Sequence, residues 1–469
     1  MRIIAPRLHT FQLCDCEPVK TKSQSFVNIP RLLQSTVLIA TTALCSLTAT
    51  AQTQDTTNAT GPVSWLHVAL EQRGRLETLT NRFYENGEGA SKVFALRSRL
   101  YAEVRELTDP LQFVIEVQDS RGTLADNPFF LPEQHNNELD FLQAQIRLSS
   151  NSNDQDMTSM QLQIGRFTMD LGGRRLAARN RMRNTTNAFD GVLWRIGQST
   201  NWTLRTFASR PVIINPTALD SSRDGGLFWG SSYTRRLSQR TTIESYYLGL
   251  KDKAGIVPNR QYSTLGGRLV RSPASGSADL EIESVWQFGR TDDLTHKAHF
   301  QHGTMGYQFS TVWQPRMAFQ YDFASGDDNP DDEQFGRFDT LFGARRFELN
   351  PTGIYGPFTR SNLHTPGLRL SANPNDNFRM SVFYRAFWLA ESRDAWVGPM
   401  LQDPTGSAGR FLGNQVEIAA IWQLLPSLNA EIGYTHFYKG SFIDNISGPF
   451  VPVVDSNFFY AAWTFRTSL

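Results

Sequence analysis

The chain has 469 residues, with 46 basic side chains against 45 acidic ones, three cysteines and a mean hydropathy of −0.37. The near-zero formal charge argues against a general nucleic-acid binder, because such proteins carry a clear basic excess. The negative mean hydropathy argues against a bundle of membrane-spanning helices, since each span needs about 20 apolar residues. A membrane β-barrel is still allowed, because its strands are apolar only at every second position.

The first 51 residues have the layout of a secretory signal peptide. Five basic and two acidic residues precede an apolar run from Leu32 to Leu47, and Ala49-Thr50-Ala51 then provides an A-x-A cleavage site. An N-terminal membrane anchor is the alternative, but Gln34-Ser35-Thr36 interrupts a run that is already short. We therefore predict a cleaved signal peptide over 1–51 and a short periplasmic segment over 52–64.

Cleavage after this leader would remove every thiol, because Cys14, Cys16 and Cys45 all lie inside it. The remaining chain could then form no disulfide, thiolate metal site or cysteine nucleophile. It would also be slightly acidic, since the leader holds more basic than acidic residues. Its basic residues are almost all arginine, as the whole chain has only seven lysines.

From residue 65 onward, the recurring pattern is strict alternation of apolar and polar residues. Over 280–288, for example, the residues at 280, 282, 286 and 288 are apolar and alternate with Glu281, Glu283 and Gln287. A period of two over about ten residues indicates a strand with one apolar and one polar face. Eighteen such strands are predicted, at 65–77, 92–107, 111–121, 137–149, 158–169, 188–197, 201–210, 226–236, 240–251, 260–271, 278–290, 297–310, 315–325, 360–372, 377–390, 411–424, 428–438 and 456–469.

The connections alternate in length. Those after odd-numbered strands tend to be long, as at 170–187 and 326–359, whereas those after even-numbered strands tend to be short, as at 425–427. Long external loops and short periplasmic turns are typical of outer-membrane barrels. The connection at 291–296 is shorter than this rule requires. We predict an all-β fold over 65–469, a single transmembrane antiparallel β-barrel of about 18 strands.

A soluble β-sandwich or propeller is the alternative, because it also has alternating strands. Strands of ten or more residues exceed the usual five or six of soluble sheets. Tryptophans such as Trp65, Trp388 and Trp463 lie near strand ends, as expected at membrane interfaces. The chain also ends on an alternating strand, from Phe459 to Leu469, of the kind that barrel assembly machinery binds. These features favour a membrane barrel, with outer-membrane lipid and the assembly machinery as partners.

In a barrel, the strand positions that have polar side chains face the lumen. This rule predicts which arginines point inward. The inward candidates are Arg73, Arg75, Arg97, Arg99, Arg105, Arg268, Arg369, Arg379 and Arg385. Glutamates such as Glu71 and Glu281 share this parity, so for any single arginine a role in bracing the wall is favoured over a role in conduction. Collectively, arginines favour carboxylate-bearing solutes, because a guanidinium binds a carboxylate through two parallel hydrogen bonds. Exposed pairs contribute only about 0–1 kcal/mol each, and such weak binding suits a passive pore.

Several segments resemble the alginate export family of outer-membrane porins. They are Ile164-Gly165-Arg166, Asp170-Leu171-Gly172-Gly173-Arg174-Arg175-Leu176, Asn187-Ala188-Phe189-Asp190-Gly191-Val192, and the segments 246–250, 264–269, 283–289, 325–332, 338–342 and 433–440. The resemblance spans about 65–469. It implies an 18-stranded barrel in the outer membrane of a Gram-negative bacterium, through which the anionic polysaccharide alginate passes along an arginine-lined constriction. It also implies periplasmic export proteins as partners.

The resemblance further implies that Arg166 and Asp190 are pore residues. Arg166, however, has the parity of Met160 and Ile164, which are apolar. It would face the lumen only if Gly165 formed a β-bulge, and would otherwise lie at the rim of the barrel with its charged end in water.

Other chemistry finds little support. Asp327, Asp328, Asp331 and Asp332 cluster hard oxygens that could hold a structural Ca²⁺, but the EF-hand spacing is missing and a solvated loop is the alternative. His296, His299 and His302 alternate faces on a strand, so we expect no zinc site. G-x-S-x-G, P-loop and H-E-x-x-H motifs are not found. We expect no enzyme and no other cofactor. An uptake porin for small carboxylated nutrients and a surface receptor or adhesin acting through the loops are the alternative functions.

Overall fold

The computed structural model describes residues 65–84, 87–105, 110–123, 132–150, 158–198, 200–253, 258–346, 348–446 and 451–468. The chain divides into two compact units, Met1–Gly61 and Pro62–Leu469, and all described residues belong to the second. The predicted signal peptide over 1–51 and the segment 52–64 lie outside the described residues.

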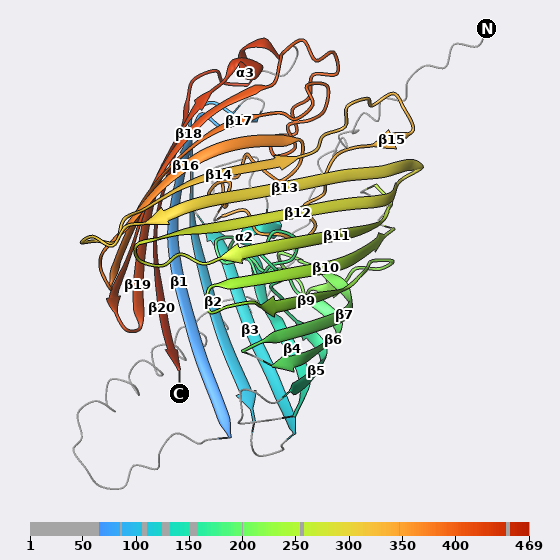
Figure 1. Cartoon of the computed structure of the whole chain (residues 1–469), viewed down its shortest axis with the longest axis vertical. Coiled ribbons are helices and arrows are strands. Elements are labelled where there is room, and N and C mark those ends of the chain that lie inside the picture. The colour runs from blue at the N-terminus through green and yellow to red at the C-terminus, as the bar shows by residue number, and fades with distance from the viewer. Residues whose placement is uncertain are drawn as a thin grey trace, which may run out of the picture. The chain divides into compact units, whose positions relative to one another are not determined.

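The described residues form a closed antiparallel β-barrel (Figure 1). Its wall strands are β1 Leu66–Thr80, β2 Ala90–Val104, β3 Leu111–Thr123, β4 Asn137–Ser150, β5 Ser159–Phe167, β6 Phe189–Gln198, β7 Trp202–Ile213, β9 Leu227–Arg236, β10 Thr241–Asp252, β11 Arg260–Arg271, β12 Ser277–Thr291, β13 Leu294–Gln308, β14 Arg316–Ala324, β16 Leu363–Asn375, β17 Phe378–Trp388, β18 Phe411–Leu425, β19 Leu428–Lys439 and β20 Ser456–Ser468. Each pairs with its neighbour in the chain, and β1 pairs with β20 from Ala69–Ser468 to Thr80–Asn457, which closes the barrel. The prediction of 18 strands is confirmed.

Four short elements lie between the wall strands. The two-residue strands β8 (Ser221–Ser222) and β15 (Gln334–Phe335) pair with β7 and β13, respectively. The helices are α2 (Pro132–His135) and α3 (Ser441–Asn445). Among the described residues, none of the helices has the length and apolar character needed to cross a membrane.

The sequence pattern predicts long connections after odd-numbered wall strands. The connection between β12 and β13, the eleventh and twelfth wall strands, is short instead. Only Asp292 and Asp293 separate the two strands, and each strand has 15 residues. Asp292 takes the left-handed conformation, with φ of 50°, that tight hairpin turns favour. These two strands therefore extend as far as the long loops do on other parts of the barrel. At this tip, β15 of the loop after β14 pairs with β13.

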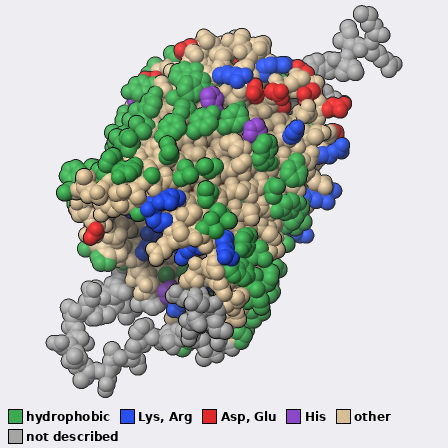
Figure 2. Space-filling view, viewed as in Figure 1, with side chains coloured by type: hydrophobic (Ala, Val, Ile, Leu, Met, Phe, Trp, Pro, Cys, Tyr) green, Lys and Arg blue, Asp and Glu red, His purple; other side chains and the backbone are tan. Residues whose placement is uncertain are grey.

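The two faces of the wall differ as the alternation predicts. On β12, Ile282 and Trp286 are exposed on the outside, whereas Glu283 and Gln287 are buried on the inside. Apolar side chains extend over much of the outer wall (Figure 2). Monomeric soluble proteins rarely expose apolar patches beyond a few hundred Å², so this surface is built to contact lipid.

The sequence pattern missed what fills the inside. Two loops, 168–188 after β5 and 325–362 after β14 (described except for residue 347), contact inward-facing residues of the wall. Apolar residues at the long-loop end, including Phe189, Phe207 and Phe228, point inward and pack with Met169 and Leu171 of the 168–188 loop. A second apolar cluster joins wall residues to Leu349, Ile354 and Phe358 of the 325–362 loop. Apolar side chains therefore replace part of the polar inner face at the long-loop end.

We expect the outer face to resist charge in a depth-dependent way. Leu265→Arg, at the middle of β11 on the outside, should lower the free energy of unfolding from lipid vesicles by about 2–4 kcal/mol. The same change at Leu237, in the turn after β9, should cost about 0–1 kcal/mol because it lies near the interface. Denaturant titration of refolding into vesicles measures both, and equal losses would contradict a lipid-facing wall.

Candidate functional site

Four arginines of β1 and β2 point into the lumen and are almost completely buried. Arg73 and Arg75 lie on β1, and Arg97 and Arg99 lie on β2. The antiparallel register places Arg73 opposite Arg97 and Glu71 opposite Arg99. Side chains two residues apart share a face of a strand, so the sequence alone brings these arginines together.

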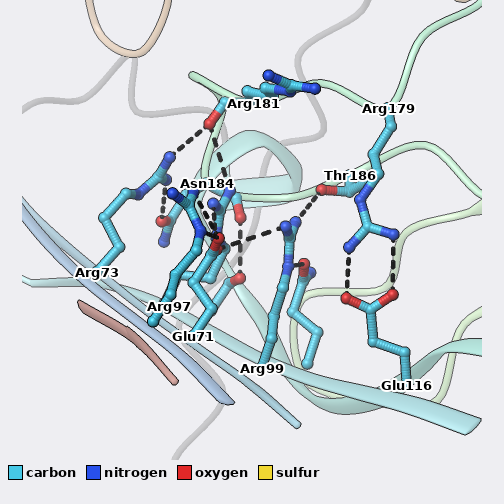
Figure 3. Close-up of polar contacts among 12 residues, drawn as sticks. Glu71, Arg73, Arg97, Arg99, Glu116, Arg179, Arg181, Asn184 and Thr186 are labelled. Atoms are coloured by element: carbon cyan, nitrogen blue, oxygen red, sulfur yellow. Dashed lines mark hydrogen bonds and ion pairs between the residues drawn. The ribbon is translucent and has the colours of Figure 1, made fainter. Parts of the chain in front are cut away.

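These arginines hold the 168–188 loop by its backbone (Figure 3). Arg73 Nη1 donates to the carbonyl of Arg181 at 2.5 Å, and Arg97 Nη1 donates to that of Arg183 at 3.2 Å. Arg75 Nη1 donates to the carbonyl of the intervening Met182. Three consecutive loop carbonyls therefore accept hydrogen bonds from the arginines of the wall.

Asn184, in the same loop, bonds to β1, β2 and α2. Its amide nitrogen donates to the carbonyls of Leu96, at 3.0 Å, and His135, at 2.7 Å. Its amide oxygen accepts from Arg73 Nη2 at 2.9 Å. The side chain is fully buried, so replacing it would leave several polar groups without partners, each costing about 1–3 kcal/mol. Sequence reasoning did not identify Asn184.

Positive charge exceeds negative charge in this cluster. Glu71 pairs with Arg97 at 2.7 Å and with Arg466 at 2.8 Å, Glu77 pairs with Arg75, and Glu116 pairs with Arg179. Arg73 forms no ion pair within 4.0 Å in the part of the chain that the structure describes. The six arginines 73, 75, 97, 99, 179 and 466 thus face three glutamates, 71, 77 and 116.

Some of these charges remain accessible. A cavity of about 510 Å³ is lined by residues that include Arg99, Tyr101, Glu116, Arg179 and Arg466. The side chains of Arg179 and Arg466 are 28% and 57% exposed, whereas Arg73 is only 5% exposed. A solute in the lumen can therefore touch Arg179 and Arg466 but not Arg73.

Arg175 joins the two inward loops to the opposite wall. It pairs with Glu281 at 2.8 Å and with Glu283, both on β12, and with Glu348 of the 325–362 loop at 2.5 Å. The loops also meet through their backbones, because a Cβ on Gly343 would lie 1.7 Å from the carbonyl oxygen of Arg175. Arg175 is therefore the central ion-pair partner of the two loops.

His302, Asp322 and Glu348 bring metal-binding residue types together, and theirs is the one such group among the described residues. Arginine side chains already pair with the carboxylate oxygens of Asp322 and Glu348. Arg385 donates to Asp322 at 2.5 Å, and Arg175 and Arg360 pair with Glu348. Burial alone would raise the pKa of Glu348, but Arg175 and Arg360 lower it below its ordinary value. The arrangement fits a network of ion pairs better than a metal centre.

The remaining inward candidates lie away from the β1–β2 cluster. Arg268 pairs with Glu281 at 2.9 Å, and Arg369 stacks over the ring of Phe383 at 4.1 Å. Arg385 is fully buried beside Asp322. Arg379 has the inward parity but is exposed at the short-turn end, and Arg105 is exposed beyond the end of β2.

Arg166 and Asp190 do not line the lumen, which corrects the placement that the resemblance implied. They pair with each other at 2.8 Å across β5 and β6, and the register runs without a bulge at Gly165. They therefore share the outer face with the exposed Ile164 and Val192. Arg166 lies at the rim, as its parity predicted.

At this rim, Arg166 and Asp190 line a cavity of about 630 Å³ together with Asp140 and Asp220. Asp220 belongs to the loop after β7, and its carboxylate accepts from the backbone of Asn215 and the amide of Asn137. Burial and the neighbouring Asp140 raise the pKa of Asp220 to about 6.

The aspartates of the 325–362 loop do not converge. Asp331 pairs with Arg393 at 2.7 Å, and Asp327 accepts from the backbone of Gly336 at 3.0 Å. Neither these two nor Asp328 and Asp332 belong to a group that gathers three metal-binding residues in the described residues. Calcium binding in this loop stays a prediction.

The three histidines lie as their spacing predicts. His299 stacks on Trp286 on the outer face, with 5.0 Å between ring centroids. His296 and His302 are buried on the inner face.

One signal in the sequence could have revealed the inward loop. The segment 171–189 contains five arginines and no acidic residue. A solvated external loop has no need of such a bias, whereas a loop inside the barrel can pair its arginines with glutamates of the wall, as Arg175 and Arg179 do. Arg175, Arg179, Arg181 and Arg183 belong to this segment, and none was named as a lumen residue from the alternation of the strands.

A closed barrel with an apolar outside and an arginine-rich lumen, narrowed by loops folded into it, defines a porin-type membrane protein. The chain belongs to the alginate export family, whose sequence profile matches residues 64–449. The family and the fold are those of transport proteins and point to a bacterial outer membrane.

Solved structures with the same fold include three proteins of Pseudomonas aeruginosa. OccK3 (OpdO) is 14% identical with a TM-score of 0.56, over 86% of this chain and 96% of that one. OpdQ is 12% identical with a TM-score of 0.56, over 86% and 97%. OccK2 (OpdF), solved in complex with glucuronate, is 12% identical with a TM-score of 0.56, over 86% and 96%. At these identities the likeness shows the fold alone. A search of curated proteins found no match.

Removing the charge of Arg175 should loosen both inward loops. Arg175→Gln leaves Glu281, Glu283 and Glu348 without their common partner, and losing one member of a buried ion pair costs about 3–5 kcal/mol. We expect larger and noisier single-channel conductance than in the native protein. Arg174→Gln is the matched control, because the ion pair of Arg174 with Asp170 lies within its own loop. Equal conductance in the two variants would contradict the role of Arg175.

The rim cluster should make stability depend on pH. Because the pKa of Asp220 is raised to about 6 from 3.8, its contribution is fully present below pH 4 and is lost as the pH rises through 6. Asp220→Asn, which carries no charge, should flatten the difference in Tm between pH 4 and pH 8. Thermal unfolding in detergent measures this, and an unchanged pH profile would exclude Asp220 as the titrating group.

Proposed function

We propose that this protein is a passive channel for anionic polysaccharide or oligosaccharide of the alginate type in the outer membrane of a Gram-negative bacterium. The observation that carries the proposal is the excess of arginine over glutamate in the lumen around Arg73. Membership of the alginate export family supports a polyuronate as the solute. Each residue of such a polymer carries a carboxylate, which suits the planar fork of a guanidinium.

The arginines divide into two roles in this proposal. Arg73, Arg75 and Arg97 are buried and hold the 168–188 loop, so they act on a solute only through their charge. Arg179 and Arg466 are accessible at the cavity and would contact carboxylates directly. Exposed pairs contribute only about 0–1 kcal/mol, which allows a solute to leave as readily as it binds.

A small carboxylated nutrient is the second candidate solute. The inward loops narrow the lumen, and the described cavity at Arg179 has a volume of about 510 Å³, which suits a small molecule. OccK2 (OpdF), which has the same fold, was solved in complex with glucuronate, a single sugar acid. Both candidates need an anion-selective channel, and they differ in the size of the solute.

Planar-bilayer recordings test the proposal. We expect the native protein to favour anions and to be blocked by polymannuronate but not by neutral dextran. Arg466→Glu should shift the reversal potential toward cations, because it reverses an accessible charge in the lumen. Arg271→Glu is the matched control, since Arg271 is exposed on the outer parity of β11.

Three results would overturn parts of the proposal. Block by glucuronate but not by the polymer would favour the small nutrient. Equal block by polymannuronate and dextran would remove the role of charge. A barrel that does not conduct would instead support a surface receptor that acts through its loops.

A further inference from the structure

The turn between β13 and β14 has an apolar tip. It covers residues 309–315 and places Val312 and Trp313 at its tip, where they are 85% and 53% exposed. The turns at 272–276 and 376–377 have small or polar residues instead, as in Ser275 and Asp376. Two adjacent apolar side chains at this exposure indicate a contact with something other than water.

The backbone of this turn holds its tip outward under strain. Trp313 and Gln314 have φ values of 71° and 44°, a left-handed conformation that residues with a side chain rarely adopt. Hydrogen bonds fix this conformation. Phe309 N donates to the carbonyl of Pro315 at 2.9 Å, and Asn373 N donates to that of Trp313 at 2.8 Å. The tryptophan is thus presented at the surface and not folded against the protein.

The tip continues the apolar outer face of the barrel. The bond from Phe309 to Pro315 continues the pairing of β13 with β14, in which Gln308 lies opposite Arg316. The outer face of this pair includes Met317 and Phe319, which are exposed on β14 and lie opposite Tyr307 and Met305. Met305 and Phe309 continue the same surface on the side of β13. The turn lies at the left of the barrel in Figure 1.

We propose that the 309–315 turn is a lipid-contact surface, in which Val312 and Trp313 lie in the headgroup region of the inner leaflet of the outer membrane. Tryptophan suits this position, because its ring is apolar while its N–H donates a hydrogen bond. Continuity with the lipid-facing wall favours lipid over a periplasmic protein as the occupant. The contact would fix the depth of the barrel near β13 and β14, independently of which solute passes through the lumen.

A site-specific fluorescent label tests the proposal. Replacing Cys14, Cys16 and Cys45 by Ser removes every native thiol, so a new cysteine is labelled alone. Val312→Cys and Trp313→Cys are labelled with an environment-sensitive nitrobenzoxadiazole, and Ser275→Cys in the turn after β11 is the matched control. Val312→Cys keeps the tryptophan and so guards against a folding defect in the other variant. The full-length protein is placed in lipid nanodiscs, which expose both faces of the bilayer.

The expected result is a blue-shifted emission at 312 and 313 that brominated lipids quench and iodide does not. The label at 275 should respond to iodide and not to brominated lipids. Iodide quenching at 312 and 313 equal to that at 275 would overturn the proposal. A label that is exposed in nanodiscs but protected in intact cells would also overturn it, in favour of a periplasmic protein.

Discussion

The structure depends on hydrogen bonds from arginines of the wall to backbone carbonyls of a loop inside the barrel. A loop in the lumen loses water around its carbonyls, and buried carbonyls need donors. Arginine offers five donors in a planar fork, so one side chain can serve two acceptors, as Arg73 does with Arg181 and Asn184. Lysine offers its three donors from a single atom. The preference for arginine over lysine is therefore explained in part by architecture, before any solute is considered.

Once the loop is fixed, the two sides of the lumen differ in charge. On the side of β1 and β2, loop carbonyls take donors that carboxylates would otherwise take, so positive charge remains in excess. On the side of β12 and β14, Glu281, Glu283, Asp322 and Glu348 neutralise Arg175, Arg268, Arg360 and Arg385. The balanced side holds the two loops together, and the unbalanced side keeps the net positive charge on which the proposed function rests. Arginine thus stabilises one half of the lumen through balanced ion pairs and gives the other half a net positive charge.

The wall could be predicted almost completely from the sequence, and the inside could not. Period-two alternation located all 18 wall strands, because burial on one face of a strand constrains every second residue. The same rule failed at the long-loop end, where Phe189, Phe207 and Phe228 point inward to pack on the 168–188 loop. Alternation reports which residues share a face, but not what covers that face. Arg166 shows the limit of a motif, since the parity argument placed it at the rim while the resemblance implied the lumen.

Burial does not remove the influence of Arg73 on a solute. A unit charge 10 Å from a carboxylate contributes about 1.7 kcal/mol at an effective dielectric constant of about 20. Several such charges raise the local concentration of anions, although salt screens them beyond about 8 Å at physiological ionic strength. In the proposed function, the accessible Arg179 and Arg466 bind carboxylates weakly, which permits release. Buried arginines that attract and exposed arginines that bind only weakly are together what a passive anion pathway requires.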